Sequence, residues 1–400
     1  MTIDWAEWLN LAIRWLHLTA GIAWIGSSFY FVWLDNHLVT PASGEASGEL
    51  WSVHGGGFYH KEKYQVAPAQ LPQDLHWFKW EAYWTWISGF SLLVLVYYVG
   101  ASSFLIDPAK PLLSVPGAIA VGLGALVAGW LVYDALCRSS LARNERLLGA
   151  IWFACLVGAA AALDQVFASR AAYLHIGAMI GSVMVGNVFF VIIPNQRKVV
   201  ADLIAGRQPD PALGKAAKQR SLHNNYMTLP VLFIMLSHHY PMTYGAQRPW
   251  LVLALLGATG VAVRHVFNLR HRARDPRPTI AFAVLLALAS VTYVTFEKGF
   301  SAQSPAAAVA AASAKAGWAD VQPLFAKHCV TCHSPHPTNP AFTAPPLGVM
   351  LDSYEHASTF APRIRRVAVD AQIMPLGNTT GMTPAERAKL GQWIAAGTPK

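Results

Sequence analysis

One short stretch near the carboxyl end of the chain has cysteine and histidine at a spacing that carries chemistry. Residues 327–337 read KHCVTCHSPHP, so Cys329 and Cys332 are three positions apart and His333 follows directly. C-x-x-C-H is the covalent attachment signature of c-type haem, in which two thiols bond the macrocycle and the histidine binds the iron. We therefore predict one covalent haem c, with Cys329 and Cys332 as its anchors and His333 as the proximal iron ligand.

The second axial ligand of such a haem is a methionine or a histidine farther along the chain. Met374 is the best candidate, because it lies in the segment AQIMPLG, where a proline follows the methionine as in the ligand loop of small cytochromes c. Met382 and Met350 are the alternatives. A helix is predicted to start at Thr383, since the sequence TPAE combines a capping box with a proline at the first helical position.

The rest of the chain is too apolar for a soluble protein. Of its 400 residues, 54% are hydrophobic and 13% are charged, whereas a soluble domain carries about 25% charged residues. Eight apolar segments approach the ~20 residues that a membrane-spanning helix needs. They are residues 9–34, 82–100, 115–137, 147–168, 172–194, 225–241, 249–268 and 279–297. We therefore predict an all-α fold: an eight-span transmembrane helical bundle (residues 1–300), a linker (301–317) and a small class I-like cytochrome c domain (318–400).

Lysine and arginine are distributed unevenly between the loops that join these segments. The loops after the first, third, fifth and seventh segments contain sixteen of them, and the intervening loops contain four. Cytoplasmic loops are enriched in these residues, so we expect a bacterial inner-membrane protein with both termini and the cytochrome c domain in the periplasm. These flanking residues also explain the net charge of +9, so the lipid bilayer is an expected partner and nucleic acid is not.

Two histidines lie inside apolar segments, where a titratable residue is costly and usually functional. His17 shares a helical face with Gly21 and Ser28, and His175 shares one with Ser182. Small residues on such a face let a helix or a flat cofactor approach closely. Two interpretations stay open: His17 and His175 ligate a b-type haem, or they are interior histidines that are hydrogen-bonded between helices.

A polar and aromatic loop follows the first apolar segment, on the side of the basic loops. It contains WSVHGGGFYHKEKY at residues 51–64 and LHWFKWEAY at residues 75–83. Gly55 and Gly56 free the backbone to present N–H groups to an anion, while aromatic rings stack on a planar ligand. The alternative is an interfacial belt of Trp, Tyr and Lys at the lipid headgroups.

A second polar cluster, SLHNNYMT at residues 221–228, lies at a predicted membrane boundary on the same side. Helix capping explains it equally well. Together the two clusters predict a pocket for a flat polar heterocycle. A cytoplasmic pocket lies across ~30 Å of hydrocarbon from a periplasmic haem, so either an intramembrane relay exists or the pocket lies deeper or on the outer side.

Several stretches resemble the bacterial membrane-bound urate oxidases, in which an eight-span domain is fused to a cytochrome c. They are WLHLTAGIAWIGSSFYF, HGGGFYHKEKY, LHWFKWEAYWTWISG, SLHNNYMTLPVLFIMLSHHYP, CVTCH and MPLGN. The resemblance extends over essentially the whole chain. It implies oxidation of urate to 5-hydroxyisourate in purine catabolism, with electrons passing to the haem and on to a respiratory acceptor such as a terminal oxidase, and without hydrogen peroxide. The haem-ligand roles of this family fall on Cys329, Cys332, His333 and Met374.

Oxidation of urate requires a base, because removing a second proton from the monoanion makes the ring easier to oxidise, and histidine titrates near the operating pH. The predicted pool that contains this base is His54, His60, His76 and His223. The residues expected to bind the anion are Gly55, Gly56, Lys61, Lys63 and Asn224. Two other functions fit the same motifs: a non-catalytic membrane cytochrome c electron-transfer subunit of a respiratory oxidase, and a transporter with a redox sensor domain.

Overall fold

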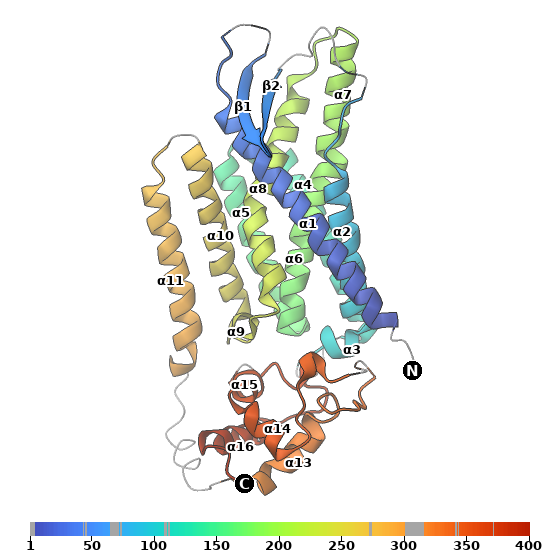
Figure 1. Ribbon diagram of the computed structural model, residues 1–400, viewed down its shortest axis with the longest axis vertical. Helices are drawn as coiled ribbons and strands as arrows, with labels where there is room; N and C mark the ends of the chain where they lie inside the picture. Colours follow the sequence, from blue (N-terminus) through green and yellow to red (C-terminus); the bar gives the residue numbers. More distant parts are fainter. Residues whose placement is uncertain are drawn as a thin grey trace.

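The computed structural model describes residues 5–42, 44, 46–64, 72, 74–107, 110, 113–271, 274–300, 316–340, 342, 344–370 and 372–400. Long helices form a bundle, and a smaller helical domain lies beyond one end of it (Figure 1). A pair of strands lies at the opposite end. The linker predicted at residues 301–317 falls mostly outside the described residues.

The bundle contains every apolar segment that the sequence analysis predicted as a helix. Its long elements are α1 (Trp5–His37), α2 (Trp80–Leu93) with the π-helical turn η1 (Val94–Val99), α4 (Val115–Arg138), α5 (Glu145–Val166), α6 (Ser169–Gly186) with η3 (Asn187–Ile192) and α7 (Ile193–Ile204), α8 (Pro211–Ser237), α10 (Pro249–His271) and α11 (Arg277–Phe300). Short elements join them, namely α3 (Ala101–Phe104), η2 (Ser140–Arg143) and α9 (Pro241–Tyr244).

Six helical segments among the described residues are long and apolar enough to cross a membrane. They are Trp80–Val99, Val115–Arg138, Glu145–Val166, Ser169–Ile204, Pro249–His271 and Arg277–Phe296. α1 and α8 run alongside them in the bundle (Figure 1). Neither is among these six segments: α1 carries Asn10, Arg14 and His17 within its apolar stretch, and the first half of α8 is polar. The chain therefore has the character of a multi-pass membrane protein, and the count of eight spans stays a prediction.

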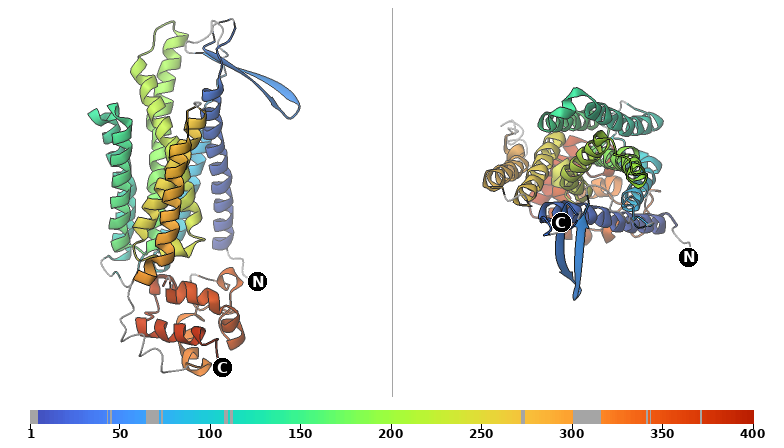
Figure 2. Two further views of the ribbon diagram at one scale, coloured as in Figure 1. Left: turned by 90° about the vertical axis from the view of Figure 1, so that its left-hand side faces the viewer. Right: turned by 90° about the horizontal axis from the view of Figure 1, so that it is seen from above.

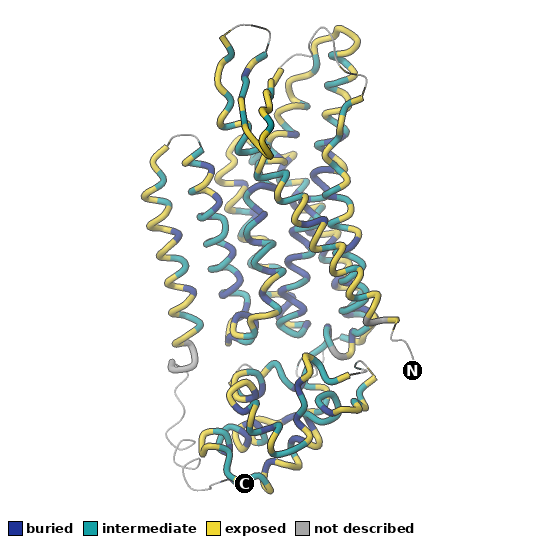
Figure 3. The backbone as a smooth tube through the Cα atoms, viewed as in Figure 1, coloured by how far each residue is buried: buried dark blue, intermediate teal, exposed yellow. Residues whose placement is uncertain are grey.

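α6 is the central helix of the bundle. It contacts α2, α4, α5 and α8, and most of its side chains are buried. Figure 3 shows that burial is concentrated in these inner helices, whereas α1 and α11 carry many exposed positions. Exposed side chains on α11 include the apolar Leu285 and Val291, as expected where lipid surrounds a helix.

The prediction of an all-helical fold is wrong at the loop after α1. There β1 (Gly48–His54) pairs antiparallel with β2 (Gly57–Lys63), and the hairpin projects away from the bundle (Figure 2). Its two-residue turn is Gly55–Gly56, with φ values of +58° and +80°. A turn of type I′ requires positive φ at both central residues, which glycine adopts without steric cost. The glycines that were interpreted as an anion-binding backbone are therefore explained by the turn.

The smaller domain is built around one apolar core. Its elements are α13 (Trp318–His328), η4 (Pro346–Gly348), α14 (Tyr354–Thr359), α15 (Ala361–Ile364), η5 (Arg365–Asp370), η6 (Leu376–Asn378) and α16 (Pro384–Ala395). Phe325 from α13 packs against Trp393 from α16, and both are almost fully buried. The helix start predicted at Thr383 is confirmed, because its hydroxyl accepts from Glu386 N and Glu386 Oε2 accepts from Thr383 N.

Candidate functional site

The C-x-x-C-H segment leaves α13 as a tight turn. Cys329 N donates to Phe325 O at 2.9 Å, and His333 N donates to Cys329 O at 2.8 Å. Cys329 and Cys332 are free thiols. One helical turn thus brings two thiols and an imidazole to the same part of the domain.

The orientation of His333 suits an iron ligand. Its Nδ1 lies 2.9 Å from Val349 O. A carbonyl oxygen only accepts, so Nδ1 carries the proton and Nε2 keeps its lone pair. Histidines that bind metals are commonly held in this way by their second nitrogen. Burial lowers the pKa of His333, which favours the neutral imidazole that binds iron.

Three methionines were considered as the opposite axial ligand. Met382 is 3% exposed and belongs to the apolar core. Met350 is partly buried and, among the described residues, is not one of the side chains that form or border this core. Met374 is partly exposed and borders the same core as Cys329. The structure therefore favours Met374 among the three, and its ligand role stays a prediction.

Arg387 holds the Met374 loop in place. Its guanidinium Nη1 donates to Met374 O at 2.6 Å and also to Ala368 O. Met374 N in turn donates to Val367 O at 3.0 Å. The loop is thus fixed at both backbone groups of Met374. Taken together, the residues of this domain fit a c-type haem.

The two histidines inside apolar helices have separate hydrogen-bond partners. His17 Nδ1 lies 2.9 Å from Thr85 O on α2, and the His17 ring packs against Gly89. His175 is fully buried, and both of its ring nitrogens are occupied: Nδ1 by Ala171 O at 2.8 Å and Nε2 by the Tyr98 hydroxyl at 3.2 Å. This arrangement favours interior histidines that are hydrogen-bonded between helices over a shared b-type haem.

The predicted urate-binding residues of the loop lie on the exposed hairpin and the segment after it. His54, Gly55, Gly56, His60 and His76 are exposed, as is Lys63. His60 Nε2 lies 2.8 Å from a Glu49 carboxylate oxygen. Lys63 pairs with Asp35 at 2.7 Å, and Lys61 donates to Ser52 Oγ. His60, Lys61 and Lys63 thus already have polar neighbours, two of which are carboxylates, so the hairpin is a poor environment for an anion.

The remaining predicted residues, His223 and Asn224, lie inside the bundle in a hydrogen-bonded network. His223 Nδ1 lies 2.7 Å from the Tyr133 hydroxyl, and Asn224 Oδ1 accepts from Asn187 Nδ2 at 2.8 Å. Arg220, which is buried, pairs with Asp134 at 2.6 Å and donates to Asn187 Oδ1 at 3.0 Å.

This network joins α4, η3 and α8. Sequence reasoning found His223 and Asn224 through the SLHNNYMT cluster. It counted Arg220 only as a loop charge, because α8 starts at Pro211 rather than at residue 225.

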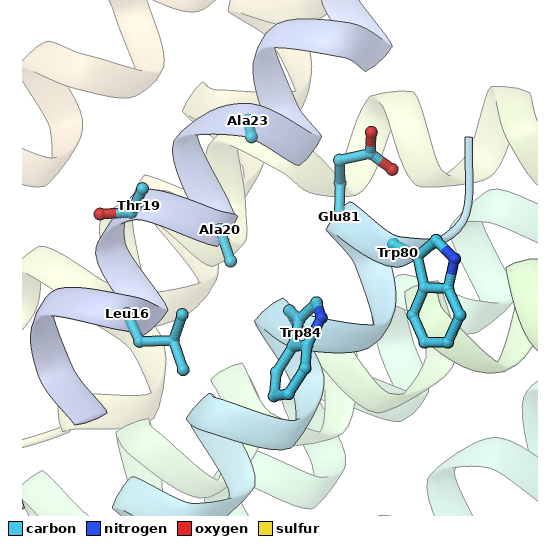
Figure 4. Close-up of a pocket in the computed structure, with 7 residues that line it drawn as sticks. All are labelled: Leu16, Thr19, Ala20, Ala23, Trp80, Glu81 and Trp84. Atoms are coloured by element: carbon cyan, nitrogen blue, oxygen red, sulfur yellow. The ribbon is translucent and has the colours of Figure 1, made fainter. Parts of the chain in front are cut away.

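One cavity of about 360 Å³ lies between α1 and α2 (Figure 4). Its lining is mostly apolar, and its one charged group is Glu81. The lining residues are Leu16, Thr19, Ala20, Ala23, Trp80, Glu81 and Trp84. A carboxylate in an apolar setting repels an anion, so this cavity is not suited to urate.

A second cavity, of about 390 Å³, lies between the bundle and the smaller domain. Phe104, Lys110 and Arg170 line it from the bundle, and Met374 and Arg387 line it from the other side. Lys110 is engaged within the bundle, since its Nζ donates to Asp164 O at 2.6 Å and to Phe167 O at 3.1 Å. The cavity therefore marks the junction at which the Met374 loop meets the bundle.

The fold defines a mostly helical protein with several helices that can cross a membrane. Residues 4–295 match the family described as Urate oxidase N-terminal. The chain therefore belongs to this family, and its coarse functional class is a urate-related oxidoreductase. No curated protein and no solved structure matches the chain.

Proposed function

We propose that the chain oxidises urate to 5-hydroxyisourate and passes the electrons through its own c-type haem to a respiratory acceptor, such as a terminal oxidase. The protein spans a bacterial inner membrane eight times, with both termini and the haem domain in the periplasm. The observation that carries the proposal is the union, in one chain, of the matched region 4–295 with a segment whose cysteines and His333 fit haem attachment.

The placement of the loops supports this topology. The strands β1 and β2 and the junction between α10 and α11 lie at one end of the bundle, and the haem domain lies at the other (Figure 1). The loops at the first end are the ones rich in lysine and arginine. The distribution of basic residues therefore supports a periplasmic position for the end that carries the proposed haem domain.

The reaction balances with water and a one-electron acceptor. Urate and water give 5-hydroxyisourate, two protons and two electrons. When bound, the haem supplies a one-electron acceptor that is filled and emptied twice per urate. The chain itself has to bind a planar monoanion, take a proton from its ring and exclude competing reactions.

The protein environment favours a reaction site within the bundle. His60 and Lys63 of the hairpin are paired with carboxylates, whereas polar side chains inside the bundle are shielded from water. Shielding strengthens the attraction between an anion and its partners.

The test is an anaerobic titration of the purified full-length protein with urate. Because each urate supplies two electrons, half an equivalent is expected to reduce the haem completely, as followed by its absorption. A haem that stays oxidised would indicate the non-catalytic electron-transfer subunit instead.

A variant with both attachment cysteines removed completes the test. Cys329→Ala with Cys332→Ala is expected to lack covalent haem and to stop steady-state urate consumption. Undiminished consumption by this variant, with release of hydrogen peroxide, would refute the haem as electron acceptor.

A further inference from the structure

A buried arginine with unpartnered donors lies between α1, α8 and α10. Arg264, on α10, is 3% exposed. Its Nε and Nη2 have no hydrogen-bond partner among the described residues. An unpaired charge inside a membrane bundle is costly and is retained for function. The two free groups also form one edge of the guanidinium, which is the edge that binds planar anions through two parallel hydrogen bonds.

An aromatic ring covers one face of this arginine. The guanidinium carbon of Arg264 lies 4.0 Å from the centroid of the Phe29 ring, which comes from α1. The ring face satisfies part of the charge through a cation–π interaction. It does not satisfy the N–H groups, which point outward from the guanidinium edge. A ligand at that edge is therefore both hydrogen-bonded and close to an aromatic surface.

Two buried amides complete the cluster. Asn268 lies one turn after Arg264 on the same face of α10, and Asn225 comes from α8. Asn268 Nδ2 donates to Asn225 Oδ1 at 3.0 Å, while Asn225 Nδ2 and Asn268 Oδ1 have no partner among the described residues. Asn225 is 0% exposed and Asn268 is 5% exposed. Because one amide donates to the other, the pair keeps one free donor and one free acceptor whichever way the amides are turned.

The unpartnered donors and acceptor of these side chains are complementary to the edge of an oxidised purine. Together they offer three donor groups, two of which belong to the cationic guanidinium of Arg264, and one acceptor. An oxopurine anion presents alternating carbonyl oxygens and ring nitrogens along its edges, with one negative charge spread over them. We propose that Arg264, Phe29, Asn225 and Asn268 form the binding site for a planar oxopurine monoanion. The choice of urate as that anion rests on the proposed function, whereas the hydrogen-bonding pattern does not.

This site lies inside the bundle, so it is closer to the haem domain than the exposed hairpin is. Arg264 is fifteen residues from Pro249, at the end of α10 nearest the haem domain, which corresponds to about 22 Å along the helix. It is seven residues from His271 at the other end, or about 10 Å. The site thus lies nearer the end with the basic loops, but well inside the bundle. It is also on the face of α8 opposite to His223, since Asn225 contacts α10 and His223 contacts α4.

Equilibrium dialysis of labelled urate against the full-length protein tests the site without requiring turnover. Arg264→Gln removes a charge-assisted pair of hydrogen bonds and is expected to weaken urate binding about tenfold to a hundredfold. Arg264→Lys keeps the charge but not the two-donor edge, and an intermediate loss is expected. Arg270→Gln is the matched control, because it removes an exposed charge from the same helix, and its affinity is expected to equal that of the unmodified protein.

A variant at a different residue keeps the site testable if the arginine variants do not fold. Phe29→Leu keeps an apolar side chain, and it is expected to weaken urate binding several-fold while leaving the absorption of the attached haem unchanged. If Arg264→Gln, Arg264→Lys and Phe29→Leu all bind urate as tightly as the unmodified protein, the site is refuted.

Haem reduction separates this proposal from the proposed function. If urate reduces the haem of these variants at the same urate concentrations as in the unmodified protein, the site is refuted and the proposed function stands. Urate that binds the unmodified protein in an Arg264-dependent way without reducing the haem refutes the function and leaves the site standing. Absence of any urate binding to the unmodified protein refutes the assignment of urate to this site.

Discussion

The ring of Phe104, in α3, lies 6.3 Å from the ring of Phe342 in the haem domain, measured between centroids. Phe342 follows a loop that is tied to the attachment segment, because Asn339 N donates to Thr331 O at 2.9 Å, between the two cysteines of the motif. This contact therefore brings the bundle next to the part of the chain that is proposed to hold the haem.

The same phenylalanine continues an aromatic series into the bundle. Phe104 lies 6.3 Å from Tyr97, and Tyr97 lies 6.2 Å from His175. Electron transfer falls steeply with distance, so closely spaced rings that lead from the smaller domain into the bundle would shorten each step toward the proposed haem. His175 is the innermost ring of this series.

Phe104→Ala is expected to slow haem reduction by urate several-fold while leaving urate binding unchanged, because it opens a gap in the series at the junction of the domains. Stopped-flow absorption of the haem after anaerobic mixing measures this rate. Phe282→Ala, which removes an exposed ring of α11, serves as the control. Equal rates for both variants would show that electrons do not pass through Phe104.

Met374→Ala is expected to leave the haem covalently attached but to abolish the low-spin spectrum of a methionine-ligated iron. The reason is that Met374 and Cys329 border the same apolar core, so Met374 is the methionine expected to bind the iron. Visible absorption and magnetic circular dichroism of the purified variant measure the change. Met350→Ala is the control, because Met350 does not border that core. A spectrum that changes only in Met382→Ala would transfer the ligand role to Met382.

Periodicity and hydropathy predicted the helices of the bundle because a span in lipid has to be both apolar and long. All eight apolar segments are helical, and the helix start at Thr383 follows from capping chemistry that is local in sequence. The first half of α8 was missed because it is polar and its burial depends on partners from α4 and η3. The hairpin was missed although Gly-Gly between strand-forming residues is a turn signal, because the glycines were attributed to anion binding.

The functional residues were harder to predict than the helices. Cys329, Cys332 and His333 stand at a fixed local spacing, so the motif alone identifies them. Arg264 and Asn268 lie within an apolar segment at a spacing of four, which is a readable signal for one polar helical face. Their pairing with Phe29 and Asn225 depends on contacts between three helices, and no local pattern encodes those contacts.

If His271 is the base that takes a proton from urate, His271→Gln is expected to lower turnover at saturating urate at least about a hundredfold, because general bases contribute about 10²–10⁴-fold, with little effect on urate binding. His271 follows Arg264 and Asn268 on one face of α10, and its Nδ1 has no partner among the described residues. Its ring lies 5.3 Å from that of His37. His223→Gln, on the opposite face of α8, is expected to keep turnover within a few-fold. A larger loss in His223→Gln would instead identify His223, which contacts Tyr133, as the base.

Glu386 gives the haem domain a predictable dependence on pH. The Thr383 amide and hydroxyl, together with His328 and Lys327, hold the pKa of Glu386 well below its usual range. The resulting stabilisation is fully present above the unfolded pKa of about 4.3 and is lost as the pH falls through the lower folded pKa.

The unfolding temperature of the haem domain, followed by circular dichroism of the haem band in the full-length protein, is therefore expected to fall below about pH 4.3. Glu386→Gln is expected to lower it at neutral pH and to flatten its dependence on acid. Asp370→Asn, at an exposed carboxylate, is the control. A Glu386→Gln profile parallel to that of the unmodified protein would contradict this role.

Asp134 binds two arginines of opposite exposure, which allows a matched comparison. Arg220 Nη2 and Arg138 Nε each lie 2.6 Å from one of its carboxylate oxygens, but the Arg220 side chain is 4% exposed and the Arg138 side chain 71%. Arg220→Met leaves the carboxylate and the Asn187 side chain without their buried partner, so the bundle is expected to lose about 3–5 kcal/mol of stability. Arg138→Met removes an exposed pair worth about 0–1 kcal/mol.

Thermal unfolding of both variants in detergent measures the difference in stability. The double variant Asp134→Leu with Arg220→Met is expected to recover part of the loss, because it removes the buried charge together with its partner. Equal unfolding temperatures for Arg220→Met and Arg138→Met would show that the network around His223 does not stabilise the bundle.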